Sequence, residues 1–151
     1  MKSFFLFLTA LGCFQIANAQ TAEDSVKATV NKLFEGMKAS DAQMIQEVFG
    51  DSAVLQTITR NKEGKTVVLN EEVKAFAASV AKLAKGDADE RIQFDVVKTD
   101  GPLAIVWTPY RFFYKGNFSH CGVNSFQLVR FNGVWKIQYL IDTRRKSGCQ
   151  E

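Results

Sequence analysis

The stretch that decides the fold is residues 118–143, "FSHCGVNSFQLVRFNGVWKIQYLIDT". It contains two segments rich in β-branched and aromatic residues, and Asn132-Gly133 separates them. Such segments are typical of β-strands, and Asn-Gly between them is a strong signal for a two-residue hairpin loop. The stretch therefore predicts an antiparallel hairpin in which Phe131 pairs with Val134.

Two further strand-like segments precede this hairpin, "RIQFDVVKT" (91–99) and "PLAIVWTPYRFFY" (102–114). Turn signals separate the segments at Asp100-Gly101 and at Lys115-Gly116-Asn117. Regularly spaced strands with such turns indicate an antiparallel meander that continues almost to the end of the chain.

Helical patterns come before the meander. Apolar residues recur every three or four positions over residues 21–37, which predicts an amphipathic helix. A second helix is expected after Ser40, which forms a capping-box pattern with Gln43, and a third after Asn70 as N-cap. Between them, "AVLQTITRNKEGKTVVL" (53–69) predicts two short strands. The fold class is therefore α+β, with three N-terminal helices packed on a strongly curved antiparallel sheet.

The first 19 residues have the features of a secretory signal peptide. A lysine is followed by an apolar run over residues 4–13 and by Ala17-Asn18-Ala19, a small-residue cleavage pattern. Cleavage there leaves one domain, residues 20–151, in a secreted or periplasmic protein without a stable membrane span. A lipoprotein attached through Cys13 is the less favoured alternative, because Ala10 occupies the position where a large aliphatic residue is expected.

Charge and residue counts argue against several classes of function. The formal net charge is only +3, which is unlike the footprint of a nucleic-acid-binding protein. A single histidine without a close carboxylate cluster predicts no metal site, and no cofactor-binding motif is recognised. Cys121 and Cys149 could pair in an oxidising compartment. Free thiols are the preferred interpretation, because one cysteine lies in a strand and the other in a polar tail.

Three phrases carry a resemblance to a known superfamily: "VFGDSAVLQT" (48–57), "FSHCGVNSFQLVR" (118–130) and "NGVWKIQYLIDTRR" (132–145). With the order of elements, they resemble the nuclear transport factor 2-like superfamily, in particular its SnoaL-like and putative lumazine-binding members. The resemblance implies a cone-shaped fold over the whole mature chain. It does not identify the function, because this fold serves isomerases, dehydratases, transport factors and ligand-binding domains.

The hairpin also predicts which side chains share a face. Neighbouring strand residues point to opposite faces, so His120 and Cys121 cannot activate each other. Continuing the ladder from Phe131 and Val134 places Asn124, Tyr139 and Arg145 on the concave face with His120. A β-bulge at Gly122 would bring Cys121 to that face instead of His120.

The next turn adds two residues to this predicted pocket. If Lys115-Gly116 is a two-residue loop, Trp107 and Arg111 also face the pocket; a three-residue loop would reverse this assignment. The expected site is an apolar concavity with a polar mouth of Trp107, Arg111, His120, Asn124, Tyr139 and Arg145. Because Arg presents a planar fork of donors to carboxylates, the predicted ligand is a small acidic organic molecule.

A second hypothesis is a cofactor-free isomerase, lyase or hydrolase in which His120 acts as general acid or base.

The opposite face is predicted to hold Cys121, Asp142 and Arg144, which are secondary candidates. There Asp142 and the neighbouring arginines are more simply interpreted as a surface ion network. Aromatic residues of segment 102–114 are expected to cover the outer face of the sheet and to bury it in a homodimer.

Overall fold

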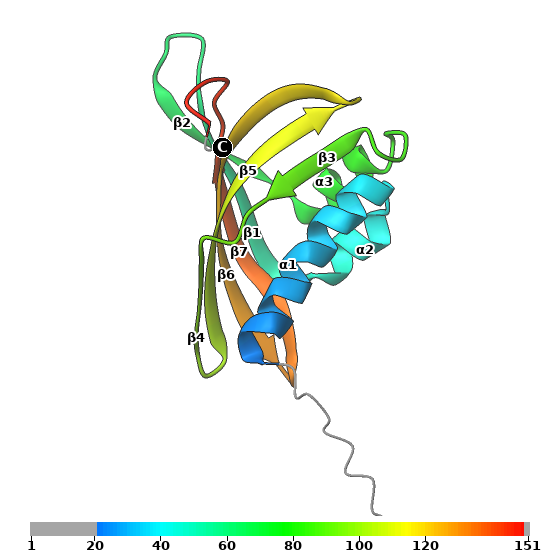
Figure 1. Cartoon of the computed structure of the whole chain (residues 1–151), viewed down its shortest axis with the longest axis vertical. Helices are drawn as coiled ribbons and strands as arrows, with labels where there is room; N and C mark the ends of the chain where they lie inside the picture. Colours follow the sequence, from blue (N-terminus) through cyan, green and yellow to red (C-terminus); the bar gives the residue numbers. More distant parts are fainter. Residues whose placement is uncertain (1–20, 150–151) are drawn as a thin grey trace, which may run out of the picture.

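The computed structural model describes residues 21–149. The predicted signal peptide and Cys13 therefore lie outside the described residues. Three helices form one layer and seven strands form the other (Figure 1). The helices are α1 (Ala22–Ala39), α2 (Ala42–Glu47) and α3 (Val73–Val80).

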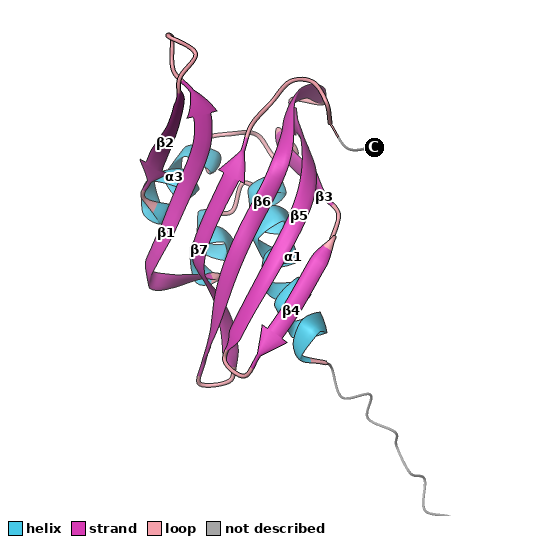
Figure 2. Cartoon of the chain, turned by 90° about the vertical axis from the view of Figure 1, so that its left-hand side faces the viewer, coloured by secondary structure: helices cyan, strands magenta, loops and turns pink. Residues whose placement is uncertain are grey.

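The strands form one curled sheet in the order β2-β1-β7-β6-β5-β3, and β4 also pairs with β5. Figure 2 shows this sheet in front of the helices. The predicted α+β class is confirmed, but the sheet is mixed, because β1 runs parallel to β7. The strands are β1 (Phe49–Arg60), β2 (Thr66–Glu71), β3 (Ala88–Ile92), β4 (Val96–Asp100), β5 (Leu103–Tyr114), β6 (Asn117–Phe131) and β7 (Val134–Thr143).

The first helix begins where the sequence predicts, but the next two begin later than predicted. Thr21 and Asp24 form a capping box at the start of α1. Ser40 is the C-cap of α1, in the left-handed conformation, and not the N-cap of α2. The N-cap of α2 is Asp41, whose side chain accepts a hydrogen bond from the backbone amide of Met44. Asn70 lies inside β2, and α3 starts after Glu72, because strand pairing with β1 extends through this segment.

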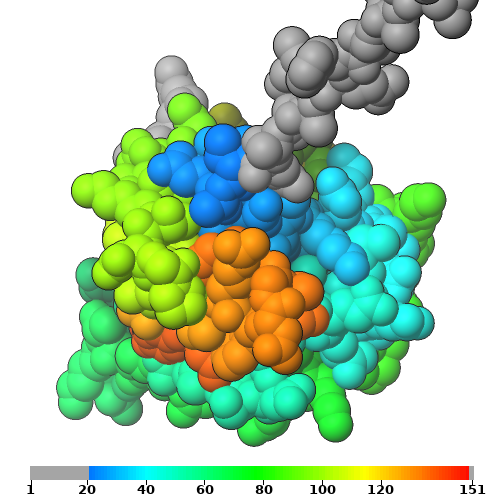
Figure 3. Space-filling view, turned by 90° about the horizontal axis from the view of Figure 1, so that it is seen from below, coloured from blue at the N-terminus to red at the C-terminus, as the bar shows by residue number. Residues whose placement is uncertain are grey.

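The core lies between α1 and the concave face of the sheet. The buried face of α1 carries Val26, Val30 and Leu33, each at most 1% exposed. Phe34 meets Phe126 of β6 edge to face, with ring centroids 6.2 Å apart. Seen from below, the first turns of α1 lie beside the β6–β7 hairpin (Figure 3). Burial of these apolar surfaces holds the helical layer on the sheet.

The predicted two-residue loop at Asn132-Gly133 is confirmed, and of the two alternatives for the turn at Lys115-Gly116 the structure has the two-residue loop. Phe131 pairs with Val134 around Asn132-Gly133, and Tyr114 pairs with Asn117 around Lys115-Gly116. The central residues of both loops have positive φ, which Gly and Asn tolerate best. The segment predicted as one strand over 91–99 is split into the end of β3 and most of β4, which pair in succession with β5.

Candidate functional site

A cavity of about 160 Å³ lies between the helices and the concave face of the sheet. Its apolar wall comes mostly from α1, α3 and the turn after α3, with contributions from the sheet. Its polar side chains come from the strands and from the residue that follows β7. These polar residues are Thr57, Glu71, Glu90, Tyr110, His120, Asn124, Asp142 and Arg144.

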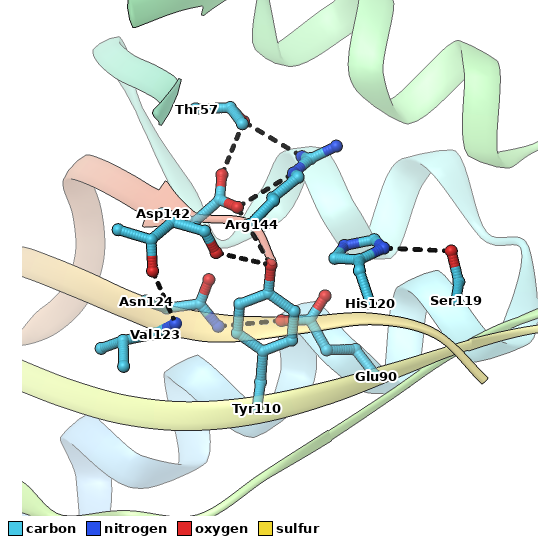
Figure 4. A network of polar contacts seen from close by, with 10 residues as sticks. Thr57, Glu90, Tyr110, Ser119, His120, Val123, Asn124, Asp142 and Arg144 are labelled. Atoms are coloured by element: carbon cyan, nitrogen blue, oxygen red, sulfur yellow. Dashed lines mark hydrogen bonds and ion pairs between the residues drawn. The ribbon is translucent and has the colours of Figure 1, made fainter. Parts of the chain in front are cut away.

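Asp142 is the centre of a polar network on this wall (Figure 4). Its side chain is buried and accepts hydrogen bonds from the Thr57 hydroxyl at 2.5 Å and from the Tyr110 hydroxyl at 3.1 Å. Nε of Arg144 lies 3.0 Å from the same carboxylate, and a terminal nitrogen of Arg144 donates to the Thr57 hydroxyl. A buried carboxylate needs such partners, so the network fixes three strands and the chain after β7 around one wall of the cavity.

The network changes the proton affinities of its members. Burial opposes the charge of Arg144, but the adjacent Asp142 carboxylate outweighs it and raises the pKa of the guanidinium. Burial and the Asp142 charge raise the pKa of Tyr110, so its hydroxyl keeps its proton. Asp142 is therefore held by a permanent cation and by neutral hydroxyl donors.

Glu90 is a second carboxyl group in the cavity, on β3. The buried amide of Asn124 donates a hydrogen bond to Glu90 Oε1 at 2.8 Å. Burial raises the pKa of Glu90 to about 7; the Asn124 hydrogen bond opposes this shift, and the Asp142 carboxylate adds to it. Glu90 can therefore change its protonation state near neutral pH.

His120 faces the same cavity from β6, as predicted. Its ring lies 5.7 Å from Tyr110 and 5.0 Å from Phe112, centroid to centroid, and its Nδ1 is 3.1 Å from the Ser119 hydroxyl. Burial, and then the nearby Arg144 charge, lower the pKa of His120. The imidazole is therefore neutral at pH 7 and able to accept a proton.

One β-bulge overturns the predicted faces of β5. Phe113 pairs with Phe118, but Phe112 pairs with His120, so Ser119 is the extra residue. Arg111 consequently pairs with Cys121, and Trp107 with Ser125. The prediction that Trp107 and Arg111 line the pocket is therefore wrong, because both lie on the outer face. The concave face of β5 instead carries Thr108, Tyr110 and Phe112, which the predicted register placed outside.

A second bulge overturns the predicted faces at the end of β7. Leu128 pairs with Ile137, as expected, but Gln127 pairs with Tyr139, which leaves Gln138 as the extra residue. From there Asp142 lies opposite Asn124, while Tyr139 and Arg145 turn to the outer face. Asp142 and Arg144, predicted on the opposite face as a surface ion network, instead line the cavity, and Tyr139 and Arg145 do not.

Cys121 is on the outer face, as expected from strand alternation, but it is not a free thiol. It forms a disulfide with Cys149, so the preferred interpretation of free thiols is wrong. Two backbone hydrogen bonds between Cys121 and Arg145 hold the chain after β7 alongside β6, close enough for Cys149 to reach Cys121. The polar composition of the tail did not reveal this pairing.

Gly122 carries no bulge. A Cβ at this position would lie 1.7 Å from the Thr143 carbonyl oxygen and 2.8 Å from the Tyr110 ring. Only glycine therefore allows the end of β7 to approach β6 so closely.

Glu90, Thr57 and Tyr110 were not identified as site residues from the sequence. Ala88, Glu90 and Ile92 are two residues apart and share the concave side of β3. This pattern is visible only if the strand is known to begin at Ala88. Within residues 21–149, no group of three or more His, Cys, Asp or Glu side chains is placed to hold a metal ion. The helices in this part of the chain also lack the combination of length and apolar character needed to cross a membrane.

Solved structures share the fold at low sequence identity. A protein of unknown function with a cystatin-like fold from Nostoc punctiforme superposes with a TM-score of 0.66 and 13% identity, over 84% of this chain and 95% of that one. A nuclear transport factor 2-like protein of unknown function from Silicibacter pomeroyi gives 0.62 and 18%, over 80% and 93%.

A third structure is described as a putative dehydratase of the nuclear transport factor 2-like family, from Streptomyces avermitilis. It gives a TM-score of 0.59 and 14% identity, over 83% of this chain and 96% of that one. No curated protein matches the sequence. The sequence profile of the family described as "Putative lumazine-binding" matches residues 21–138. The chain therefore belongs to the putative lumazine-binding family and has the nuclear transport factor 2-like fold.

Proposed function

We propose that this protein binds a small organic molecule in the cavity between the helices and the sheet. The observation that carries the proposal is the division of the cavity into an apolar helical wall and a sheet wall with convergent polar groups. Small-molecule sites commonly combine an apolar concavity with a few fixed polar groups. The family description, which refers to lumazine, supports the same kind of function.

The division of the walls predicts how a ligand lies. An apolar or aromatic part contacts α1 and α3, where Phe34 and Phe76 line the cavity. Polar substituents face Glu90, Asn124 and Arg144 on the opposite wall. The prediction of an acidic ligand loses most of its support, because Arg111 and Arg145 lie outside the cavity and Arg144 is already paired with Asp142.

Binding can be tested with lumazine and with small aromatic acids, by thermal shift and titration calorimetry. A ligand that binds only the folded state raises the midpoint of unfolding with increasing ligand concentration. The variant Phe76→Asp should abolish this shift, because it places a charge on the apolar wall. Asn31→Asp, at an exposed position of α1, is the control for one added negative charge. If none of the compounds stabilises the wild-type protein, the proposal is refuted for these ligand classes.

A proton-transfer enzyme without a cofactor is the second candidate function. It is favoured by His120, whose lowered pKa keeps the imidazole neutral beside the Glu90, Tyr110 and Asp142 site. For any substrate found, His120→Gln should remove nearly all turnover while substrate still binds. Loss of binding and turnover in parallel would instead assign His120 to ligand binding alone.

We also propose secretion or a periplasmic location and homodimerisation through the outer face of the sheet. The Cys121–Cys149 disulfide supports an oxidising compartment. The outer face of β5 exposes Leu103, Ile105 and Trp107 by 43–45% each, a row of apolar side chains that a partner would cover. The aromatic residues predicted for this surface, Tyr110 and Phe112, line the cavity instead, so the proposed interface consists of other residues of β5.

A further inference from the structure

Glu90 differs from Asp142, the buried acidic group of the polar wall, in that it has no cation beside it in the described part of the chain. Asp142 is paired with Arg144 at 3.0 Å and bonded to two hydroxyl groups. Glu90 receives one hydrogen bond, from Asn124 to Oε1, and forms no ion pair within residues 21–149. Its Oε2 accepts no hydrogen bond from this part of the chain, so it is available to a ligand.

The charges around Glu90 leave the cavity acidic. Arg144 is the permanently charged cation among the cavity residues, and Asp142 balances it. Glu71 at the end of β2 adds a further exposed carboxylate, whereas Tyr110 on β5 and His120 on β6 are neutral at pH 7. The cavity side chains from α1 and α3 are apolar, which leaves Glu90 without a counter-charge from the helices.

We propose that Glu90 selects ligands that present a cationic or N–H-donating nitrogen group, such as an amidine, an amine or a heterocyclic N–H, and disfavours carboxylates. This inference rests on the proposed binding function and specifies the ligand class. A nitrogen donor would give Glu90 Oε2 the charge-assisted hydrogen bond that the protein itself does not supply. Asn124 holds the other oxygen and thereby fixes the orientation of the carboxylate.

The same arrangement predicts how affinity depends on pH. Because Glu90 has a pKa of about 7 in the empty cavity, it is mostly protonated at pH 6 and mostly ionised at pH 8. A cationic ligand binds the ionised form, so its affinity rises by up to about tenfold over this interval. His120 adds to the trend at the acid end, because its protonation places a positive charge in the cavity; comparison with a Glu90 variant separates the two groups.

The test uses three aromatic probes of nearly the same shape: benzamidine (a cation), benzamide (neutral) and benzoate (an anion). An apolar cavity of similar volume binds benzene, so one ring is a suitable size. Titration calorimetry of the full chain at pH 8 should give affinities in the order benzamidine, benzamide, benzoate. At pH 7, benzamidine binding should release about half a proton, measured from two buffers with different ionisation enthalpies.

The variant Glu90→Gln should weaken benzamidine binding about tenfold or more, abolish the proton release and leave benzamide nearly unchanged. Glu35→Gln, on the exposed side of α1, is the matched control and should behave as the wild type. Tighter binding of benzoate than of benzamidine, or no effect of Glu90→Gln, would overturn the inference and leave the binding function intact. If neither these probes nor lumazine and the small acids bind, it is the binding function itself that fails.

Discussion

The amide of Asn124 on β6 donates a hydrogen bond to the carboxyl group of Glu90 on β3, although β5 lies between these two strands. The bond is 2.8 Å long and crosses the concave face at the base of the polar wall. It joins a residue found from the hairpin register to one that the sequence did not single out. The curvature of the sheet brings the two side chains together and so determines the chemistry of the cavity.

Glu90 should make folding stability depend on pH in a recognisable way. Its pKa is raised from an ordinary value of 4.5 to about 7 in the folded protein, so the folded state holds this proton more tightly. Between pH 4.5 and 7 the folded state binds more protons than the unfolded state, and the free energy of unfolding falls as pH rises. The loss is on the order of 3 kcal/mol at most and is complete above about pH 7.

Urea unfolding of the wild type and of Glu90→Gln at several pH values measures this contribution. The difference in unfolding free energy should favour Glu90→Gln above pH 7 and shrink towards pH 4.5. A difference that does not vary with pH would show that Glu90 ionises in the folded protein as it does in the unfolded chain.

Gly122 should not tolerate a side chain. In Gly122→Ala the new methyl group meets the Thr143 carbonyl oxygen, a backbone atom, and the Tyr110 ring. The end of β7 must move, so we expect a loss of about 3 kcal/mol or more, with Asp142 displaced from Tyr110. Gly50→Ala is the matched control, because the nearest atom there is the side-chain oxygen of Gln138, which can rotate away. Equal unfolding midpoints for the two variants would contradict the prediction.

The disulfide should contribute substantially to stability. It joins residues separated by 28 positions, and a loop of that length corresponds to about 3.5 kcal/mol of restricted unfolded-state entropy. The double variant Cys121→Ala/Cys149→Ala should therefore unfold at lower urea concentration than the wild type. Addition of a reductant should destabilise the wild type and leave the double variant unchanged; destabilisation of both would point to an effect unrelated to this bond.

The outer face of β5 should mediate self-association. Trp107 is 44% exposed at one end of the apolar row of Leu103, Ile105 and Trp107, so Trp107→Lys places a charge in the proposed interface. We expect sedimentation equilibrium to show a dimer for the wild type and a monomer for this variant. Leu69→Lys is the control, since Leu69 is similarly exposed but pairs with the cavity residue Thr57 and thus lies on the other face of the sheet. A monomeric wild type would rule out the dimer.

Local sequence preferences are sufficient to predict the last three strands of the meander and the places of the turns between them. Asn132-Gly133 specifies a two-residue loop because both of its residues adopt positive φ, which Asn and Gly tolerate best, whereas the sequence leaves the length of the loop at Lys115-Gly116 open. The alternation along β6 then correctly places His120 and Asn124 on the concave face and Cys121 on the other. These features depend on conformational preferences that each short segment carries with it.

Which residues of β5 and β7 share the concave face with His120 and Asn124 depends on long-range packing. The bulges at Ser119 and Gln138 have no distinct sequence signal, and each shifts the register by one residue and thereby exchanges the two faces of the adjoining strand. They remove Trp107, Arg111, Tyr139 and Arg145 from the predicted site and bring in Tyr110, Asp142 and Arg144. The curl of the sheet adds Glu90 from a strand two positions away, because side-chain contacts across a curved sheet depend on its three-dimensional shape.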